Sequence, residues 1–247
     1  QHSSYSEQQI QLTVQATTAL QTFARQHQLT INNLVQATWA MLLCRYSQET
    51  DIVFGATVSG RPPSLVGIES MVGLFINTLP VRVQVSADTQ VLDLLKDLQV
   101  QQVESEQYSY SSLVEIQGLS DVPRGTPLFE SIVVFENYPV DKAVRSHNYS
   151  FDLDNIHAIE QTNYPLTVVA APGEQLLVKI SYDTNRFDDA VITRLLGHYQ
   201  TLLCGIVAYP EERISELPLL SQAERHQLLV EWNDTQVDYP VDKCIHQ

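Results

Sequence analysis

Residues 51–85 read DIVFGATVSGRPPSLVGIESMVGLFINTLPVRVQV, and this stretch decides the fold class. The run at 51–58 is short and β-branched, and the turn residues Ser59 to Pro63 end it. A second stretch with alternating character follows at 76–85, where Pro80 is typical of an edge strand or a bulge. We therefore expect two strands joined by a long loop.

The hydrophobic period changes on either side of these two strands. Apolar residues recur at helical spacing in four segments, near 11–27, 30–46, 88–106 and 191–207. Further short strands are expected at 132–135, 149–159, 166–171 and 176–182. Because helices and strands do not alternate regularly, the expected fold class is an α/β sandwich with a mixed sheet.

The composition shifts after Pro210. Ser221-Gln222-Ala223-Glu224 matches a capping box, in which a serine and a glutamate satisfy free N–H groups at the start of a helix. The expected helix is short and runs through Trp232, and Asn233 to Thr235 end it. This tail is typical of a connector between domains rather than of another core layer.

The charge balance excludes several classes of partner. Lys and Arg number 14 against 29 Asp and Glu, which gives a formal net charge of -15. Such a surface repels phosphate backbones and anionic lipids, so neither nucleic acid nor a membrane is expected as a partner. We expect no stretch of about 18–20 apolar residues that could span a membrane and no signal peptide. The expected compartment is cytoplasmic, and both ends are interpreted as cuts through a longer polypeptide.

A search for reactive residue patterns finds no catalytic centre. The 7 histidines include no HxH, HxxxH or HExxH pair, and the 3 cysteines include no CxxC pair, so no metal site is expected. The sequence also lacks a GxSxG elbow, a phosphate-binding Walker loop and a GxGxxG motif. Composition and periodicity alone therefore indicate an α/β domain without assigning it a reaction.

Three segments, in order along the chain, carry a resemblance to a known family. They are SGRP at 59–62 followed by VGLFINTLPVR at 72–82, residues 110–130, and residues 217–240 with Ile245-His246. Together they resemble the condensation domain of nonribosomal peptide synthetases and the connector to the next adenylation domain. The first segment matches the family motif VGxFxNTxxxR. The second departs from the family pattern, because it lacks a His/Asn-Gln-Asp opening and has Arg124-Gly125-Thr126-Pro127 where the family has Arg-Asn-Pro.

The resemblance implies a fold with two lobes, each similar to chloramphenicol acetyltransferase, and an active-site tunnel between them. Residues 1–210 would be the C-terminal lobe, 211–240 the condensation–adenylation linker, and 241–247 the start of an adenylation domain. The family's catalytic HHxxxDG motif belongs to the N-terminal lobe and occurs nowhere in this sequence. We therefore expect no catalytic residue in this chain, which alone would be inactive.

The resemblance also suggests which residues of this chain face the substrates. Ser59, Gly60 and Arg61 would belong to a loop that crosses to the other lobe and forms the floor of the tunnel. Asn77 and Thr78 would lie in the same tunnel, where the Asn77 amide could bind the phosphopantetheine arm or a substrate carbonyl. A simpler interpretation remains open for each, because glycine makes tight turns and asparagine caps strands.

Two arginines and three aromatic residues complete the expected site. Arg82 and Arg124 are candidate contacts to the other lobe, although Arg82 could instead pair with an acidic neighbour and Arg124 could be solvated. Phe75, Phe129 and Phe135 are expected in the core.

Three functions are compared. In the first, the intact parent joins a carrier-bound aminoacyl or peptidyl thioester to an aminoacyl amine, with phosphopantetheine arms as substrate carriers and no cofactor bound directly. Its partners would be the N-terminal condensation lobe, the adjacent adenylation domain and peptidyl carrier domains. In the second, this piece is a non-catalytic interaction platform that docks the adenylation and carrier domains. The third, a stand-alone acetyltransferase, is disfavoured because it also requires the missing histidine motif.

Overall fold

A six-stranded mixed sheet organises the chain in the computed structural model, which describes residues 5–61, 66–86, 88–136 and 162–236. The strand order is β1-β6-β5-β4-β2-β3. The inner pairs β2/β4 and β4/β5 are parallel, and the other pairs are antiparallel. The strands are β1 (Tyr5–Gln11), β2 (Asp51–Val58), β3 (Asn77–Gln84), β4 (Ser131–Phe135), β5 (Leu166–Ala171) and β6 (Leu177–Asp183).

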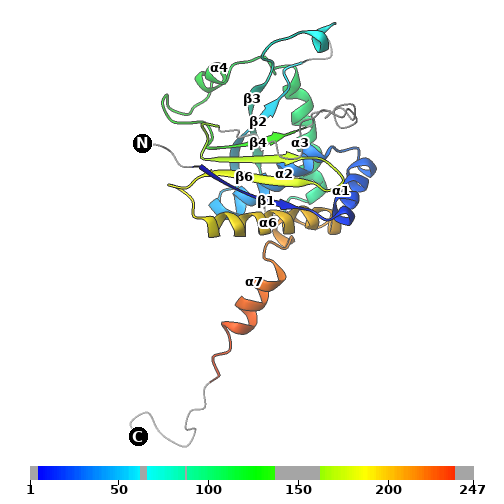
Figure 1. Cartoon of the computed structure of the whole chain (residues 1–247), viewed down its shortest axis with the longest axis vertical. Coiled ribbons are helices and arrows are strands. Elements are labelled where there is room, and N and C mark those ends of the chain that lie inside the picture. Colours follow the sequence, from blue (N-terminus) through cyan, green and yellow to red (C-terminus); the bar gives the residue numbers. More distant parts are fainter. Residues whose placement is uncertain (1–4, 62–65, 87, 137–161, 237–247) are drawn as a thin grey trace, which may run out of the picture.

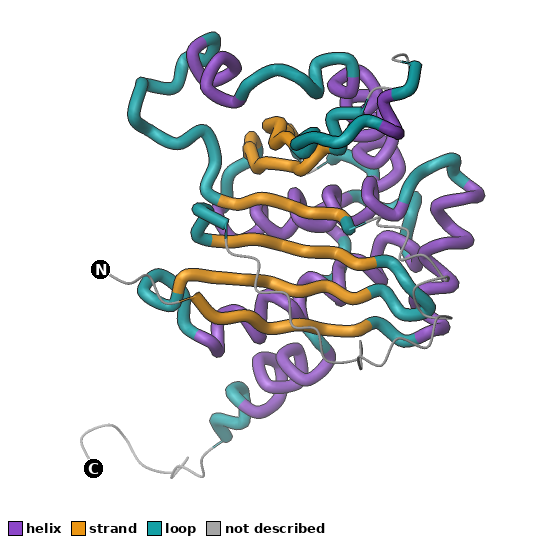
Figure 2. The backbone as a smooth tube through the Cα atoms, turned by 45° about the horizontal axis from the view of Figure 1, so that its top comes forward, coloured by secondary structure: helices purple, strands orange, loops and turns teal. Residues whose placement is uncertain are grey.

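The long helices gather on one face of this sheet (Figure 2). They are α1 (Val14–Gln26), α2 (Ile31–Ser47), α3 (Val91–Glu106) and α6 (Asp189–Ala208), and the shorter helices are α4 (Leu113–Gly118) and α7 (Gln222–His226). Figure 1 shows α6 crossing below the sheet and α4 at the opposite end, beside β3. The expected α/β architecture with a mixed sheet is confirmed.

Helix α2 forms the centre of the core. Every side chain from Asn33 to Leu42 is buried, so this helix is enclosed by other elements over its whole circumference. Two long-range hydrogen bonds connect it to β4 and α6. Trp39 Nε1 donates to Ser131 Oγ on β4 over 3.2 Å, and the Tyr199 hydroxyl on α6 donates to the Val35 carbonyl over 2.9 Å. These bonds satisfy the buried polar ends of two large aromatic side chains.

Among the described strands and α-helices, β1 and α4 were not predicted from the sequence, and one predicted strand cannot be compared. No element was expected before a helix that begins near residue 11, whereas the structure has strand β1 there. Helix α4 was not expected either. Strand β1 is polar because it lies at the sheet edge, where backbone bonds to β6 hold it without a buried side-chain pattern. The strand predicted at 149–159 lies outside the described residues.

Helix α6 differs from the expectation that no segment is long and apolar enough to span a membrane. Among the described helices, it is the one that has the necessary length and composition, with a mean hydropathy of 1.2 over 18 residues. The expectation counted uninterrupted apolar residues, whereas polar residues such as His198 and Gln200 are spaced along this helix. Half of that stretch is buried inside the molecule, as in a core helix.

The packed body continues past the expected boundary at residue 210. Ile214 and Leu217 are both 4% exposed and join the core, and the Ile214 N–H donates a hydrogen bond to the Thr89 carbonyl. Helix α7 follows and extends away from the sheet and its helices (Figure 1). The tail therefore has a docked first part and a projecting second part.

Candidate functional site

The loop after β2 is held by Arg61. Its guanidinium donates to the carbonyls of Ile68 and Met71, the latter over 3.1 Å, and lies 4.1 Å above the centre of the Phe75 ring. A cation over an aromatic face is attractive, and two carbonyls supply acceptors for the fork of N–H groups. Arg61 therefore closes the loop on itself. Phe75 is only half-buried, so its expected place in the core is wrong, and it packs under Arg61 instead.

Gly60 allows this closure. Its φ is +57°, and a Cβ atom placed there would lie 2.0 Å from the Phe75 carbonyl oxygen. No side chain fits at that distance, and a positive φ is costly for other L-residues. Ser59, the residue before it, is exposed. The SGRP sequence thus produces a turn in which backbone approaches backbone.

Asn77 joins the start of β3 to the turn after α3. Its amide nitrogen donates to the carbonyls of Ser109 and Ser111 over 2.9 and 2.7 Å, and its amide oxygen accepts from the Thr78 backbone over 2.9 Å. Thr78 is half-buried and pairs with Thr57 across the sheet. Both hydrogens of the Asn77 amide are used within this chain, so in this conformation the residue positions the turn at 107–112.

The two segments that Asn77 connects carry many exposed apolar side chains, which we call together the apolar face. Val66 is 95% exposed, Val72 103% and Leu74 92%. The loop at 66–76 and the segment with α4 both lie at the β3 end of the molecule (Figure 1), where Asn77 links them. Clustered apolar exposure of this kind marks interaction surfaces. The apolar face consists of Val66, Met71, Val72, Leu74, Ile76, Tyr108, Tyr110, Val114 and Leu119.

Arg82 pairs with an acidic neighbour. Its Nε and Nη2 atoms donate to the two carboxylate oxygens of Asp51 over 2.9 and 2.6 Å, and Gln84 adds a bond of 3.0 Å. These hydrogen bonds lower the pKa of Asp51 to about 2. Arg124 lies exposed in the loop between α4 and β4. The role of either arginine as a contact to another lobe stays a prediction.

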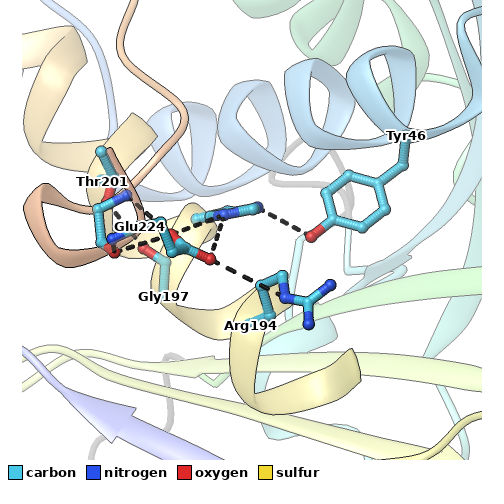
Figure 3. Close-up of polar contacts among 7 residues, drawn as sticks. Tyr46, Arg194, Gly197, Thr201 and Glu224 are labelled. Atoms are coloured by element: carbon cyan, nitrogen blue, oxygen red, sulfur yellow. Dashed lines mark hydrogen bonds and ion pairs between the residues drawn. The ribbon is translucent and has the colours of Figure 1, made fainter. Parts of the chain in front are cut away.

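The sequence analysis did not predict a second polar cluster, which is centred on His198. His198 is 5% exposed and connects Tyr46 on α2 with Glu224 on α7 (Figure 3). The three residues are far apart in the sequence and share no motif. The only signal in the sequence was the capping-box glutamate, which indicated a helix start but no partner.

Comparison with protein families decides the identity. The model of the family described as the condensation domain matches residues 1–229. This chain belongs to the condensation-domain family.

Curated relatives of this condensation-domain chain are peptide synthases. A linear gramicidin synthase protein of Brevibacillus parabrevis is 52% identical over 98% of the chain. Bacitracin synthase 3 of Bacillus licheniformis is 38% identical over 100% of the chain. The chain spans only 3% and 4% of these two relatives, which are thus many times longer.

Solved structures with the same fold include a nonribosomal peptide synthetase and a condensation domain. A four-domain nonribosomal peptide synthetase bound to AMP and glycine superposes with a TM-score of 0.78 at 18% identity, over 91% of this chain and 18% of its own. The first condensation domain of the CDA synthetase gives a TM-score of 0.65 at 17% identity, over 87% of this chain and 48% of its own. These likenesses confirm the fold.

The contacts of this arrangement can hold a loop and a turn in fixed positions. Arg61, Asn77 and Arg82 direct their donors at backbone carbonyls or a carboxylate of this chain. The sequence contains no adjacent histidine pair and hence no HHxxxDG motif. What the condensation-domain chain offers at this end is a shaped loop, a fixed turn and an apolar face.

Proposed function

We propose that this chain is the C-terminal lobe of a two-lobed condensation domain in a nonribosomal peptide synthetase. The family match and the similarity to peptide synthases support the general activity, which is peptide-bond formation. That the chain covers about half of a solved condensation domain, 48%, supports the assignment to one lobe. In this proposal the residues that act on substrate protons lie in the other lobe.

The observation that carries the proposal is the apolar face. Exposed side chains such as Val72 and Leu74 lie on a loop that is tightly organised by Arg61 and Gly60 rather than loosely extended. An organised loop that presents apolar side chains to water gains stability when another surface covers it. The second lobe would provide that surface, and the stretch from Ser59 to Thr78 would form the floor of the tunnel between the lobes.

The proposed reaction joins an amine to a thioester. The acceptor amine nitrogen attacks the thioester carbonyl carbon, a C–N bond forms, the C–S bond breaks, and the phosphopantetheine thiol leaves with a proton. Holding both reactants in one tunnel removes a large entropic barrier. This lobe would contribute by shaping the tunnel, because Arg61, Asn77 and Thr78 would all help to fix its floor. Arg82 and Arg124 would lie near the junction of the lobes.

The remaining expectations extend this proposal to the longer polypeptide. Residues 211–240 would link the lobe to an adenylation domain that begins at 241–247, and peptidyl carrier domains would deliver both substrates. Phosphopantetheine would act as the arm of those carriers, with no cofactor bound by this chain directly. The compartment would be the cytoplasm, where such carriers are loaded.

A second candidate function is a docking platform without a role in the reaction. The tail favours it, because Leu229, Val230 and Trp232 are exposed where α7 and the following turn leave the body. A platform would use this tail to bind the adenylation domain. The two functions predict that substitutions on different surfaces will lower amide formation. For the condensation lobe the surface is the apolar face, and for the platform it is the tail.

The two functions can be separated by charge substitutions in the full-length protein. We expect Val72→Glu with Leu74→Glu to lower amide formation at least about tenfold per loaded carrier, because a covered carboxylate loses its hydration. The control is Val191→Glu on α6, which is similarly apolar, 38% exposed and distant from the apolar face. Normal turnover in the double variant, together with loss of turnover in Trp232→Ala, would instead favour the platform.

A further inference from the structure

The buried histidine on α6 connects the body of the lobe to its tail. His198 Nδ1 lies 2.9 Å from the Tyr46 hydroxyl, and Nε2 lies 3.1 Å from each carboxylate oxygen of Glu224 (Figure 3). The His198 side chain is 6% exposed and that of Glu224 is 27% exposed. The contact therefore joins a buried imidazole on α6 to a carboxylate on the projecting helix α7.

The hydrogen-bond roles follow from the chemistry of the partners. An ionised carboxylate only accepts hydrogen bonds, so we assign the proton to Nε2 of His198, which donates to Glu224. Nδ1 then accepts from the Tyr46 hydroxyl. In this tautomer both ring nitrogens have a hydrogen-bond partner.

Glu224 has a second task at the start of α7. Its Oε2 atom accepts from the Ser221 backbone over 2.9 Å and from the Ser221 hydroxyl over 2.7 Å, while its own N–H donates to that hydroxyl. Partial burial opposes ionisation of Glu224, but the bonds from Ser221 and the nearby His198 outweigh it and lower its pKa. The carboxylate that begins the helix is also the one that contacts His198.

Little else holds this helix among the described residues. Helix α7 has no buried residue, and of positions 222–236 only Glu224 is less than exposed. Arg194 approaches the same carboxylate, with Nε 3.9 Å from Oε1. The direction of α7 therefore depends mainly on Glu224.

We propose that Tyr46, His198 and Glu224 form a lock that fixes the direction in which the chain leaves the lobe. With the lock closed, α7 covers His198 and the tail follows one path. With the lock open, α7 pivots about residues 217–221, and the segment that follows changes its position. The inference concerns this chain alone and does not depend on the proposed function.

Chemical modification of His198 measures whether the lock is closed. Diethyl pyrocarbonate acylates exposed neutral imidazoles, and the tryptic fragment 195–213 contains His198 as its single histidine. In the full-length protein, we expect Glu224→Ala to increase the rate of His198 acylation at least about tenfold, because the charged acceptor that holds α7 is gone. Mass spectrometry of the fragment reads the result.

Ser221→Ala is the matched control, because it removes the capping hydroxyl and leaves the contact between Glu224 and His198. We expect the rate of His198 acylation in Ser221→Ala to stay within about threefold of the rate in the protein without substitutions. Loss of the cap frays the start of the helix but does not release the Glu224 carboxylate from His198. Slow acylation in Glu224→Ala, or equally fast acylation in both variants, would overturn the lock. Because Glu224 lies in the tail, its substitution leaves the core intact, and unchanged unfolding of the lobe verifies this.

Discussion

Arg61 and Gly60 show how single residues shape the candidate site. The arginine uses its N–H groups on two carbonyls of its own loop, and the glycine permits a backbone approach that no other residue allows. From the sequence alone, an arginine in a loop is expected to face a ligand or solvent. In this chain it holds the loop together, and the surface it creates is formed by apolar neighbours such as Val72.

Substitution of Gly60 by alanine tests this account of the loop. We expect Gly60→Ala to lower the free energy of unfolding and to speed hydrogen exchange at 66–76, because the added methyl meets the Phe75 carbonyl. Gly67→Ala is the control, since Gly67 also has a positive φ of 82° but has nothing within 4 Å of the added atom. The control should show only the backbone strain of about 1–2 kcal/mol. If Gly60→Ala and Gly67→Ala had equal effects on urea denaturation and on hydrogen exchange, the close approach of Gly60 to the Phe75 carbonyl would be contradicted.

The elements divide into those that hydrophobic period predicts and those that it cannot. Helices α2 and α6 and strand β2 were predicted, because their apolar residues recur at the spacing of a buried face. Strand β1 was missed because backbone pairing at an edge leaves no apolar pattern. The loop closure and the lock were missed because Arg61, His198 and their partners meet only after folding. Periodicity predicts which segments are buried, but it does not predict which distant polar groups meet.

Asn77→Asp tests the connection between β3 and the turn at 107–112. Aspartate has the same shape and keeps an oxygen for the Thr78 N–H, but it cannot donate to the carbonyls of Ser109 and Ser111. We expect faster hydrogen exchange at 107–112 and a loss of about 1–3 kcal/mol in stability, because two acceptors face a carboxylate. Unchanged exchange in that turn would show that the side chain does not hold it. Asn163→Asp, at an exposed position before β5, is the control.

The whole molecule presents two surfaces at opposite ends of the fold. The apolar face lies beside β3, and α7 leaves from the helical layer near α6 (Figure 1). The proposed second lobe would cover the first surface, and the lock would orient the second. In the proposed function the lobe would place its neighbours, and the engagement of Arg61, Asn77 and Arg82 within the chain agrees with that role.

In the proposed function, this chain shapes a tunnel whose reacting base belongs to another part of the polypeptide. Amide formation between two carriers, one loaded with a donor aminoacyl thioester and one with an acceptor, tests it most directly. We predict product with the full-length protein and none with residues 1–247 alone, after circular dichroism has shown that the shorter chain is folded. Product formation by the folded shorter chain at a rate comparable to that of the full-length protein would contradict the claim.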